Sequence, residues 1–159
     1  MNAQRFLMPG EYYFGQDPEP VVTLLGSCVA VTLWHPLRRL LAVSHFIVPT
    51  GPLDTLDTRT GTAVFARLQQ DMIRHGTAPR EYRKGLYGGG SCLQPGNHTS
   101  LQIGLKNIAF AREQFALLGW RADDEHLGGW GYRRLMVDGR DGRLVCQSFT
   151  PPELAEGSA

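Results

Sequence analysis

A cysteine and a histidine occupy positions from which they could perform nucleophilic chemistry together. Cys28 follows a Gly-Ser turn and opens a strand-forming run, 28–34, while His45 lies within a second such run, 40–48. An imidazole beside a thiol can take its proton or stabilise the thiolate, which is the reactive form. The pair therefore indicates a cysteine nucleophile at the first residue of a strand, with His45 as general acid and base.

The link between the two runs predicts which residues face each other. Pro36 suits the second position of a type I turn, and a tight turn centred after Pro36 pairs Leu33 with Leu40 and Cys28 with His45. Residues opposed in this way share one face of the sheet, with Cβ atoms roughly 4.5–5.5 Å apart. Because side chains alternate along a strand, a bulge or an odd loop length would separate the pair.

Further groups are candidates for supporting roles. Gly26 and Ser27 form the turn that leads into Cys28, and the backbone N–H groups of such a turn can bind an oxyanion. A third group should orient the imidazole, and Thr23, just upstream of the turn, is the first candidate. Two other hydroxyl residues are alternatives, Ser44 and Thr32.

Both members of the pair also have a purely structural explanation. A cysteine in an apolar strand is often a small hydrophobic residue of the core. A histidine among valine and phenylalanine is often a hydrogen-bonded core residue. The facing positions and the Gly-Ser turn bring the chemical interpretation to equal weight with the structural one.

The rest of the chain predicts one α/β domain over residues 1–150, followed by a disordered tail, 151–159. Frequent glycine and proline, 19 and 10 of 159 residues, favour short strands and tight turns. Helical spacing of apolar residues predicts two main helices on a mainly antiparallel sheet system. The expected helices are 62–75 and 104–118, and the expected strands are 20–25, 28–34, 40–48, 84–87, 120–125, 132–137 and 143–149.

Composition argues against several classes of function. The net charge is +1, from 16 basic and 15 acidic residues, which offers no electrostatic surface for nucleic acid or an anionic membrane. No apolar stretch approaches the roughly 18 residues that span a bilayer. Three widely spaced cysteines form no CxxC pair, and the histidines lack metal-ligand spacing, so no metal site is expected. We expect a cytoplasmic protein with reduced thiols.

Several motifs together resemble one known family over about residues 10–149. Leu-Gly-Ser-Cys-Val-Ala-Val at 25–31, with His45 placed 17 residues after the cysteine, is the most specific of them. Tyr-Gly-Gly-Gly at 87–90, Ile-Gly-Leu-Lys-Asn at 103–107 and Asp-Gly-Arg-Leu-Val at 141–145 continue the match. The chain resembles the CheD family of chemoreceptor glutamine deamidases.

That resemblance implies a fold and a reaction. The fold is an α/β/β sandwich, an α+β arrangement similar to the catalytic domain of cytotoxic necrotizing factor toxins. The reaction is hydrolysis of glutamine side chains to glutamate, without a cofactor. For its mechanism we hypothesise a thioester intermediate and release of ammonia. The catalytic residues carry over to Cys28, His45 and Thr23. Several family members place the threonine one position further from the cysteine, where this chain has Val22, so another hydroxyl remains open.

The resemblance also implies partners, and it leaves alternatives. Its substrates are the cytoplasmic domains of methyl-accepting chemotaxis receptors, and a CheC-type phosphatase is a second partner. A thiol–imidazole pair would equally serve a cysteine peptidase or a transglutaminase. A non-catalytic adaptor that binds receptors or the phosphatase is the alternative from a different class.

Overall fold

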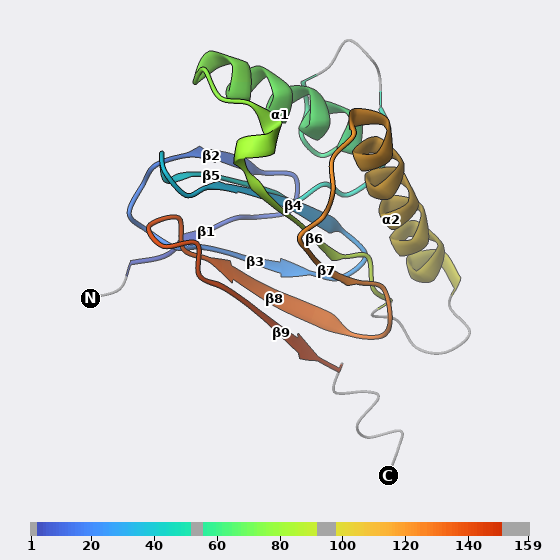
Figure 1. The fold of residues 1–159 in the computed structure, drawn as a ribbon. Helices are drawn as coiled ribbons and strands as arrows, with labels where there is room; N and C mark the ends of the chain where they lie inside the picture. The colour runs from blue at the N-terminus through green and yellow to red at the C-terminus, as the bar shows by residue number, and fades with distance from the viewer. Residues whose placement is uncertain (1–2, 52–55, 92–97, 151–159) are drawn as a thin grey trace.

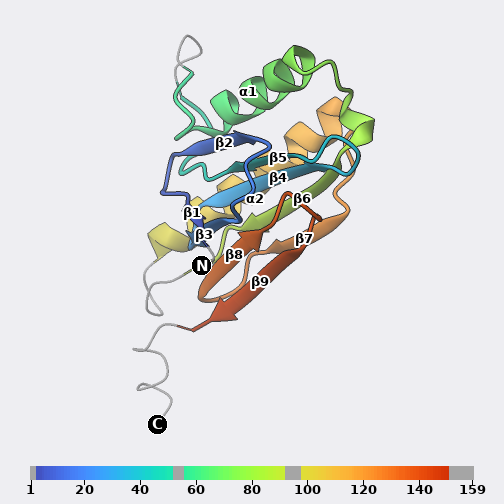
Figure 2. The ribbon, with the colours of Figure 1, turned by 90° about the vertical axis from the view of Figure 1, so that its left-hand side faces the viewer.

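The computed structural model describes residues 3–51, 56–91 and 98–150, which form three layers (Figure 1). Two helices lie on one face of a five-stranded sheet, and a four-stranded sheet lies against its other face (Figures 1 and 2). The predicted α/β/β sandwich with two main helices is therefore confirmed. The tail expected to be disordered, 151–159, lies outside the described residues.

The strands next to Cys28 are central in the five-stranded sheet. β4 (Val29–His35) pairs with β5 (Leu40–Ser44) on one side and β6 (Arg83–Gly88) on the other, all antiparallel. β2 (Tyr12–Gly15) and β7 (Asp124–Leu127) form the two edges, with β7 parallel to β6. All of β5 and nearly all of β4 is buried, so the expectation that both strands are covered on both faces is confirmed.

The second sheet is formed by segments far apart in the sequence. β3 (Val21–Leu25) lies between β1 (Arg5–Phe6), to which it is parallel, and β8 (Tyr132–Val137), to which it is antiparallel. β9 (Leu144–Phe149) pairs with β8 and forms the outer edge. The chain thus passes from this sheet into the other one at the turn between β3 and β4, directly before Cys28.

The helices begin and end at residues with a clear local cause. α1 (Gly61–Arg74) starts after Thr60, whose hydroxyl accepts a hydrogen bond from the Ala63 N–H at 3.2 Å, and Gly76 follows its end with φ +68°. α2 (His98–Leu118) ends at Gly119, which has φ +71°. A short 3₁₀ turn, η1 (Pro79–Glu81), leads into β6.

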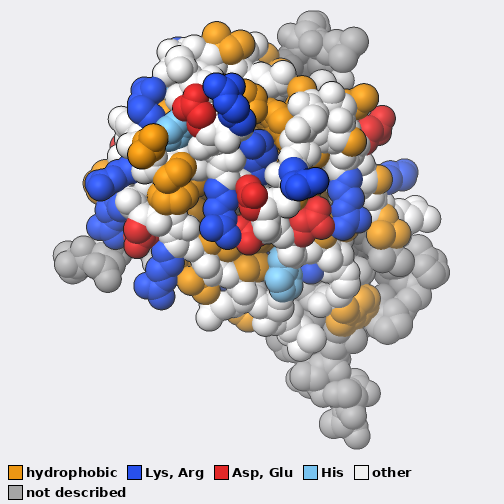
Figure 3. All heavy atoms as spheres, in the orientation of Figure 1, with side chains coloured by type: hydrophobic (Ala, Val, Ile, Leu, Met, Phe, Trp, Pro, Cys, Tyr) orange, Lys and Arg blue, Asp and Glu red, His pale blue; other side chains and the backbone are white. Residues whose placement is uncertain are grey.

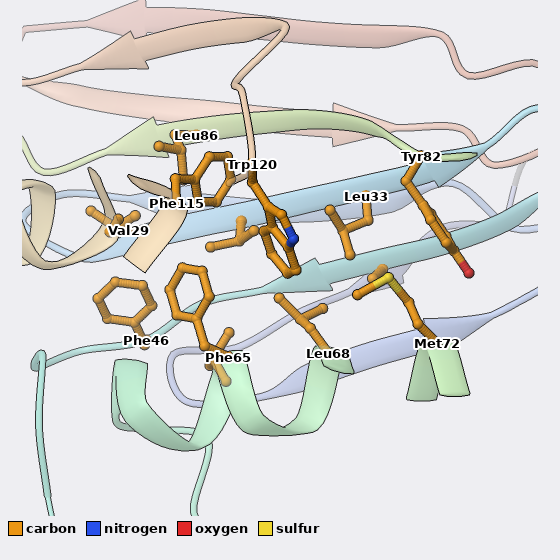
Figure 4. Close-up of a cluster of buried hydrophobic side chains, with 14 of the residues drawn as sticks. Val29, Leu33, Phe46, Phe65, Leu68, Met72, Tyr82, Leu86, Phe115 and Trp120 are labelled. Carbon is orange, nitrogen blue, oxygen red and sulfur yellow. The ribbon is translucent and has the colours of Figure 1, made fainter. Parts of the chain in front are cut away.

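Two cores result from these layers. The helix-side core lies between the helices and the five-stranded sheet and includes Phe65, Leu68, Phe115, Trp120 and Leu33 (Figure 4). The inter-sheet core lies between the two sheets. Its members are Leu7, Tyr13, Val21, Leu25, Ala30, Leu41, Val43, Tyr87, Leu135 and Val137.

Some sequence expectations about elements were wrong. α2 begins at His98, within a stretch expected to be a loop, and the third strand stops at Ser44 rather than residue 48. β7 covers Asp124–Leu127, several residues later than the expected 120–125. β1 and β2 were not anticipated, since short strands near the start of the chain carry little periodic signal.

The surface agrees with the mixed composition. Basic and acidic side chains are interspersed on the face seen in Figure 3. Among the helices of the described residues, none is long and apolar enough to cross a membrane.

Candidate active site

The β4–β5 hairpin has a different register from the one expected. Leu33 lies opposite Ala42, not Leu40, because four residues, 36–39, form the loop in place of a tight two-residue turn. Arg39 closes this loop with φ +54°, in the left-handed region. The predicted direct pairing of Cys28 with His45 is therefore wrong.

The observed register differs from the expected one by two residues. Because side chains alternate along a strand, a shift by an even number leaves each residue on the same face of the sheet. Val29 bridges Phe46, so the same register continues past the ends of both strands. His45 then lies opposite Ala30 and diagonal to Cys28, roughly 7–8 Å away between backbone positions. Cys28 and Trp34 pack against the inter-sheet core, and Ala30, on the same face, belongs to it. Sulfur and imidazole thus belong to the same layer.

Thr23 meets His45 across the two sheets. Its Oγ1 lies 2.6 Å from Nδ1 of His45 and 2.7 Å from the carbonyl oxygen of Leu7. Since the carbonyl can only accept, the single hydroxyl proton is donated to Leu7, and the hydroxyl accepts from Nδ1–H of His45. The neutral imidazole therefore carries its proton on Nδ1, and Nε2 is left with the lone pair of a base. Of the three hydroxyl candidates, Thr23 is the one that contacts the ring.

Burial sets the charge of this imidazole. His45 is 1% exposed, and desolvation lowers its pKa from 6.5 to about 4. The ring is neutral at pH 7 in the resting protein. An imidazolium that stabilises a resting thiolate, as the sequence suggested, is thus disfavoured, and the role of general base fits the ring better.

The turn before Cys28 is held through its carbonyl groups. The Gly26 carbonyl accepts from Gly90 N–H at 2.9 Å, and the Cys28 carbonyl accepts from Gly89 N–H at 2.8 Å. Gly88 permits this approach: it has φ +108°, and a Cβ there would lie 2.2 Å from the Cys28 carbonyl oxygen. Gly26 and Ser27, expected to form the oxyanion turn, lie in a bend between β3 and β4, and binding of an oxyanion there stays a prediction.

Two buried polar residues near the turn, Asn107 and Arg133, were not singled out from the sequence as site residues. Asn107 of α2 is fully buried and donates to the carbonyl of Ser27 at 2.9 Å. Arg133 is charged but only 7% exposed, and its strand, β8, lies between β3 and β9 rather than at an edge. Its guanidinium donates to Nδ1 of His126 at 2.8 Å and to the carbonyls of Gly88 and Gly128. Side chains alternate along β8, so Arg133 points to the same side as the buried Leu135 and Val137. This pattern could have placed Arg133 on the inward face from the sequence alone.

The described residues form a cleft but no group of metal ligands. In the part of the chain that the structure describes, no three His, Cys, Asp or Glu side chains gather as metal ligands. A cleft of about 330 Å³ does open between the sheets, lined among others by Thr32, Tyr87, His126 and Cys146. Cys28, the candidate nucleophile, is not among its lining residues. Cys92 lies outside the described residues.

Comparison with known proteins gives concordant matches. The family model described as CheD chemotactic sensory transduction matches residues 53–148. Among curated relatives, the probable chemoreceptor glutamine deamidase CheD 3 of Dechloromonas aromatica is 38% identical, over 84% of this chain and 80% of its own. The probable chemoreceptor glutamine deamidase CheD 2 of Albidiferax ferrireducens is 36% identical, over 92% and 87%.

A third curated relative and one solved structure are also similar to this chain, the relative over nearly its whole length and the structure more weakly. The probable chemoreceptor glutamine deamidase CheD of Pseudomonas syringae pv. tomato is 33% identical, over 96% of this chain and 93% of its own. The crystal structure of Bacillus licheniformis hypothetical protein YfiH is similar with a TM-score of 0.48 and 16% identity, over 73% of this chain and 49% of that one. From the family model and the relatives together, the chain belongs to the CheD family.

Proposed function

We propose that this protein is a glutamine deamidase that converts glutamine side chains of methyl-accepting chemotaxis receptors to glutamate. Relatives that span most of the chain carry the name chemoreceptor glutamine deamidase. The single structural observation that supports the chemistry is the contact between Thr23 and His45, because it leaves Nε2 unprotonated on the side of the imidazole away from Thr23.

The proposed first half-reaction forms a thioester. Nε2 of His45 takes the proton of the Cys28 thiol, and Sγ attacks the carboxamide carbon. The carbonyl oxygen becomes an oxyanion, which backbone N–H groups of the 26–28 turn would stabilise. As the tetrahedral intermediate collapses, the imidazolium gives its proton to the departing nitrogen, and ammonia leaves.

The second half-reaction is hydrolysis. His45 takes a proton from water, the resulting hydroxide attacks the thioester carbon, and the C–S bond breaks. Glutamate is released, and the proton returns to the Cys28 sulfur, so that one water is consumed for each ammonia produced. General acid–base transfer of this kind contributes about 10²–10⁴-fold to the rate.

The test is incubation with receptor cytoplasmic domains, followed by peptide mass mapping for conversion of glutamine to glutamate. We expect Cys28→Ser to abolish conversion and His45→Gln to lower kcat by about 10²–10⁴-fold. Cys146→Ser is the matched control, because Cys146 is another half-buried thiol in the same layer and should be dispensable. Conversion by Cys28→Ser at the wild-type rate would overturn the mechanism.

The same experiment separates the alternatives. Added primary amine would give cross-linked products with a transglutaminase, and backbone cleavage would identify a peptidase. An adaptor without catalysis would bind receptors equally well as wild type and as Cys28→Ser, with no conversion by either. The CheC-type phosphatase and the cytoplasmic location remain predictions.

A further inference from the structure

Asn107 connects the two segments that carry the candidate pair. Its side-chain Nδ2 donates to the carbonyl of Ser27 and to the carbonyl of Ile47, each at 2.9 Å. Ser27 directly precedes Cys28, and Ile47 follows His45 by two residues. One buried amide group thus bridges two chain segments that are distant in sequence and belong to the candidate site.

α2 can bring Asn107 this close because of Gly104, one helical turn earlier on the same face. A Cβ at residue 104 would lie 2.5 Å from the carbonyl oxygen of Gly89, so the helix backbone rests directly on the 88–90 segment. The N–H of Gly89 in turn donates to the Cys28 carbonyl. Helix, glycine segment and turn form one contiguous support.

This support fixes the direction of the Cys28 N–H group. A trans peptide unit is planar, with the N–H of one residue antiparallel to the C=O of the residue before it. Because Asn107 holds the Ser27 carbonyl toward α2, the N–H of Cys28 is directed away from α2. That is the side of the five-stranded sheet on which the Cys28 side chain packs against the inter-sheet core.

The chemistry of Asn107 also argues against a role in stability alone. Both partners are carbonyls, so the amide nitrogen must face them, and Oδ1 accepts no hydrogen bond from any residue that the structure describes. A buried acceptor without a partner is destabilising. The contribution of Asn107 therefore lies in the two hydrogen bonds that it donates.

We infer that Asn107 is a positioning residue, which fixes the Cys28 turn relative to the His45 segment and orients the Cys28 N–H toward the developing oxyanion. The inference rests on the proposed function for its catalytic part. Displacement of a reacting group by about 1 Å can lower a rate by about 10²-fold, so loss of this bridge should act on turnover more than on substrate binding.

The experiment compares Asn107→Leu and Asn107→Asp with Phe115→Leu. Leucine and aspartate keep the approximate size of asparagine, but neither can donate to two carbonyls at neutral pH. Phe115→Leu is the control, because Phe115 lies on the same helix in the helix-side core and should lose stability without touching the turn. If one Asn107 variant does not fold, the other still provides the test.

Two readouts are expected to separate positioning from general destabilisation. For folded Asn107 variants, kcat should fall by about 10–100-fold while KM changes little, whereas Phe115→Leu should keep the wild-type kcat. Hydrogen exchange should accelerate selectively in peptides covering 23–28 and 44–48, by about tenfold relative to the rest of the domain. Wild-type kcat in both Asn107 variants, or uniform acceleration as in Phe115→Leu, would overturn the inference.

Failure of the proposed function gives a different pattern. If the wild type converts no receptor glutamine, the deamidase proposal falls, and the iodoacetamide alkylation rate of Cys28 replaces kcat. A changed alkylation rate together with selective exchange would then still support positioning of Cys28 by Asn107. An unchanged alkylation rate would contradict it.

Discussion

The two faces of β4 differ in what they bury. The face toward the helices presents Val29, Val31 and Leu33, all apolar and fully buried. The face toward the other sheet presents Ala30 and Thr32, and it continues outward to Cys28. One strand therefore contributes to a hydrophobic core on one side and to a candidate reaction centre on the other.

The polar groups of the inter-sheet layer make the contrast sharper. Thr23, His45 and Arg133 are each less than a tenth exposed and are hydrogen-bonded across the layer. A hydrogen-bonded polar group contributes less net stability than a buried apolar side chain, so this layer stabilises less per residue than the helix-side core does. The helix-side core and the proposed reaction centre thus lie on opposite sides of one sheet. We expect substitutions on the helix side to lower stability and substitutions on the other side to lower activity.

The largest effect on stability should come from the helix side. Phe65 contacts Phe110, Phe115 and Trp120 with ring centroids 6.0 Å apart, and it is 2% exposed. We expect Phe65→Ala to lower the free energy of unfolding by about 3–5 kcal/mol, measured in urea, while the folded fraction keeps its kcat. Cys28→Ala should show the reverse. Equal loss of stability in the two variants would remove the distinction between the faces.

A somewhat smaller effect is expected from pH. The unfolded state binds a proton at position 45 near pH 6.5, whereas the folded state binds it only near pH 4, so stability falls as pH drops through this window. The loss should reach about 3 kcal/mol in the wild type relative to His45→Gln. Urea unfolding of both proteins between pH 7.5 and pH 4 measures it. Parallel curves would show that His45 is not held neutral by burial.

The smallest effect should come from Thr23→Val, which keeps the shape but removes the hydroxyl. Nδ1–H of His45 and the Leu7 carbonyl lose a partner, so we expect about 1–3 kcal/mol less stability. We also expect kcat about tenfold lower, since the ring is no longer held in one tautomer. Thr32→Val is the matched control on the same layer, with unchanged kcat. A larger loss of kcat in Thr32→Val would favour the other hydroxyl as the orienting group.

The sequence predicted local features well and long-range contacts poorly. Alternation and helical spacing were sufficient for most of the fold because each element buries a regular stripe of apolar residues. The loop after β4 was misjudged because Pro36 suits a tight turn, while the left-handed Arg39 that closes a longer loop carries no sequence signal. The pair of Cys28 and His45 remained on one face because the error was an even number of residues.

Residues that act through tertiary contacts were harder to recognise. Asn107 lies 80 residues from Ser27, and nothing in its neighbourhood along the chain indicates which carbonyl it meets. The charge of Arg133 suggests an exposed residue, whereas the alternation of β8 places it on the buried face. In both cases the missing information was which distant backbone carbonyl lies within reach.

The contact between Thr23 and His45 has a consequence for when the protein acquires reactivity. Thr23 belongs to β3, which is held in its sheet by β8, a strand near the carboxyl end of the chain, whereas His45 belongs to the other sheet. In a nascent chain that does not yet include β8, we expect Thr23 not to be held in position to hydrogen-bond the His45 ring. If His45 activates the Cys28 thiol as proposed, we expect that activation to begin only once β8 has completed the sheet that holds Thr23.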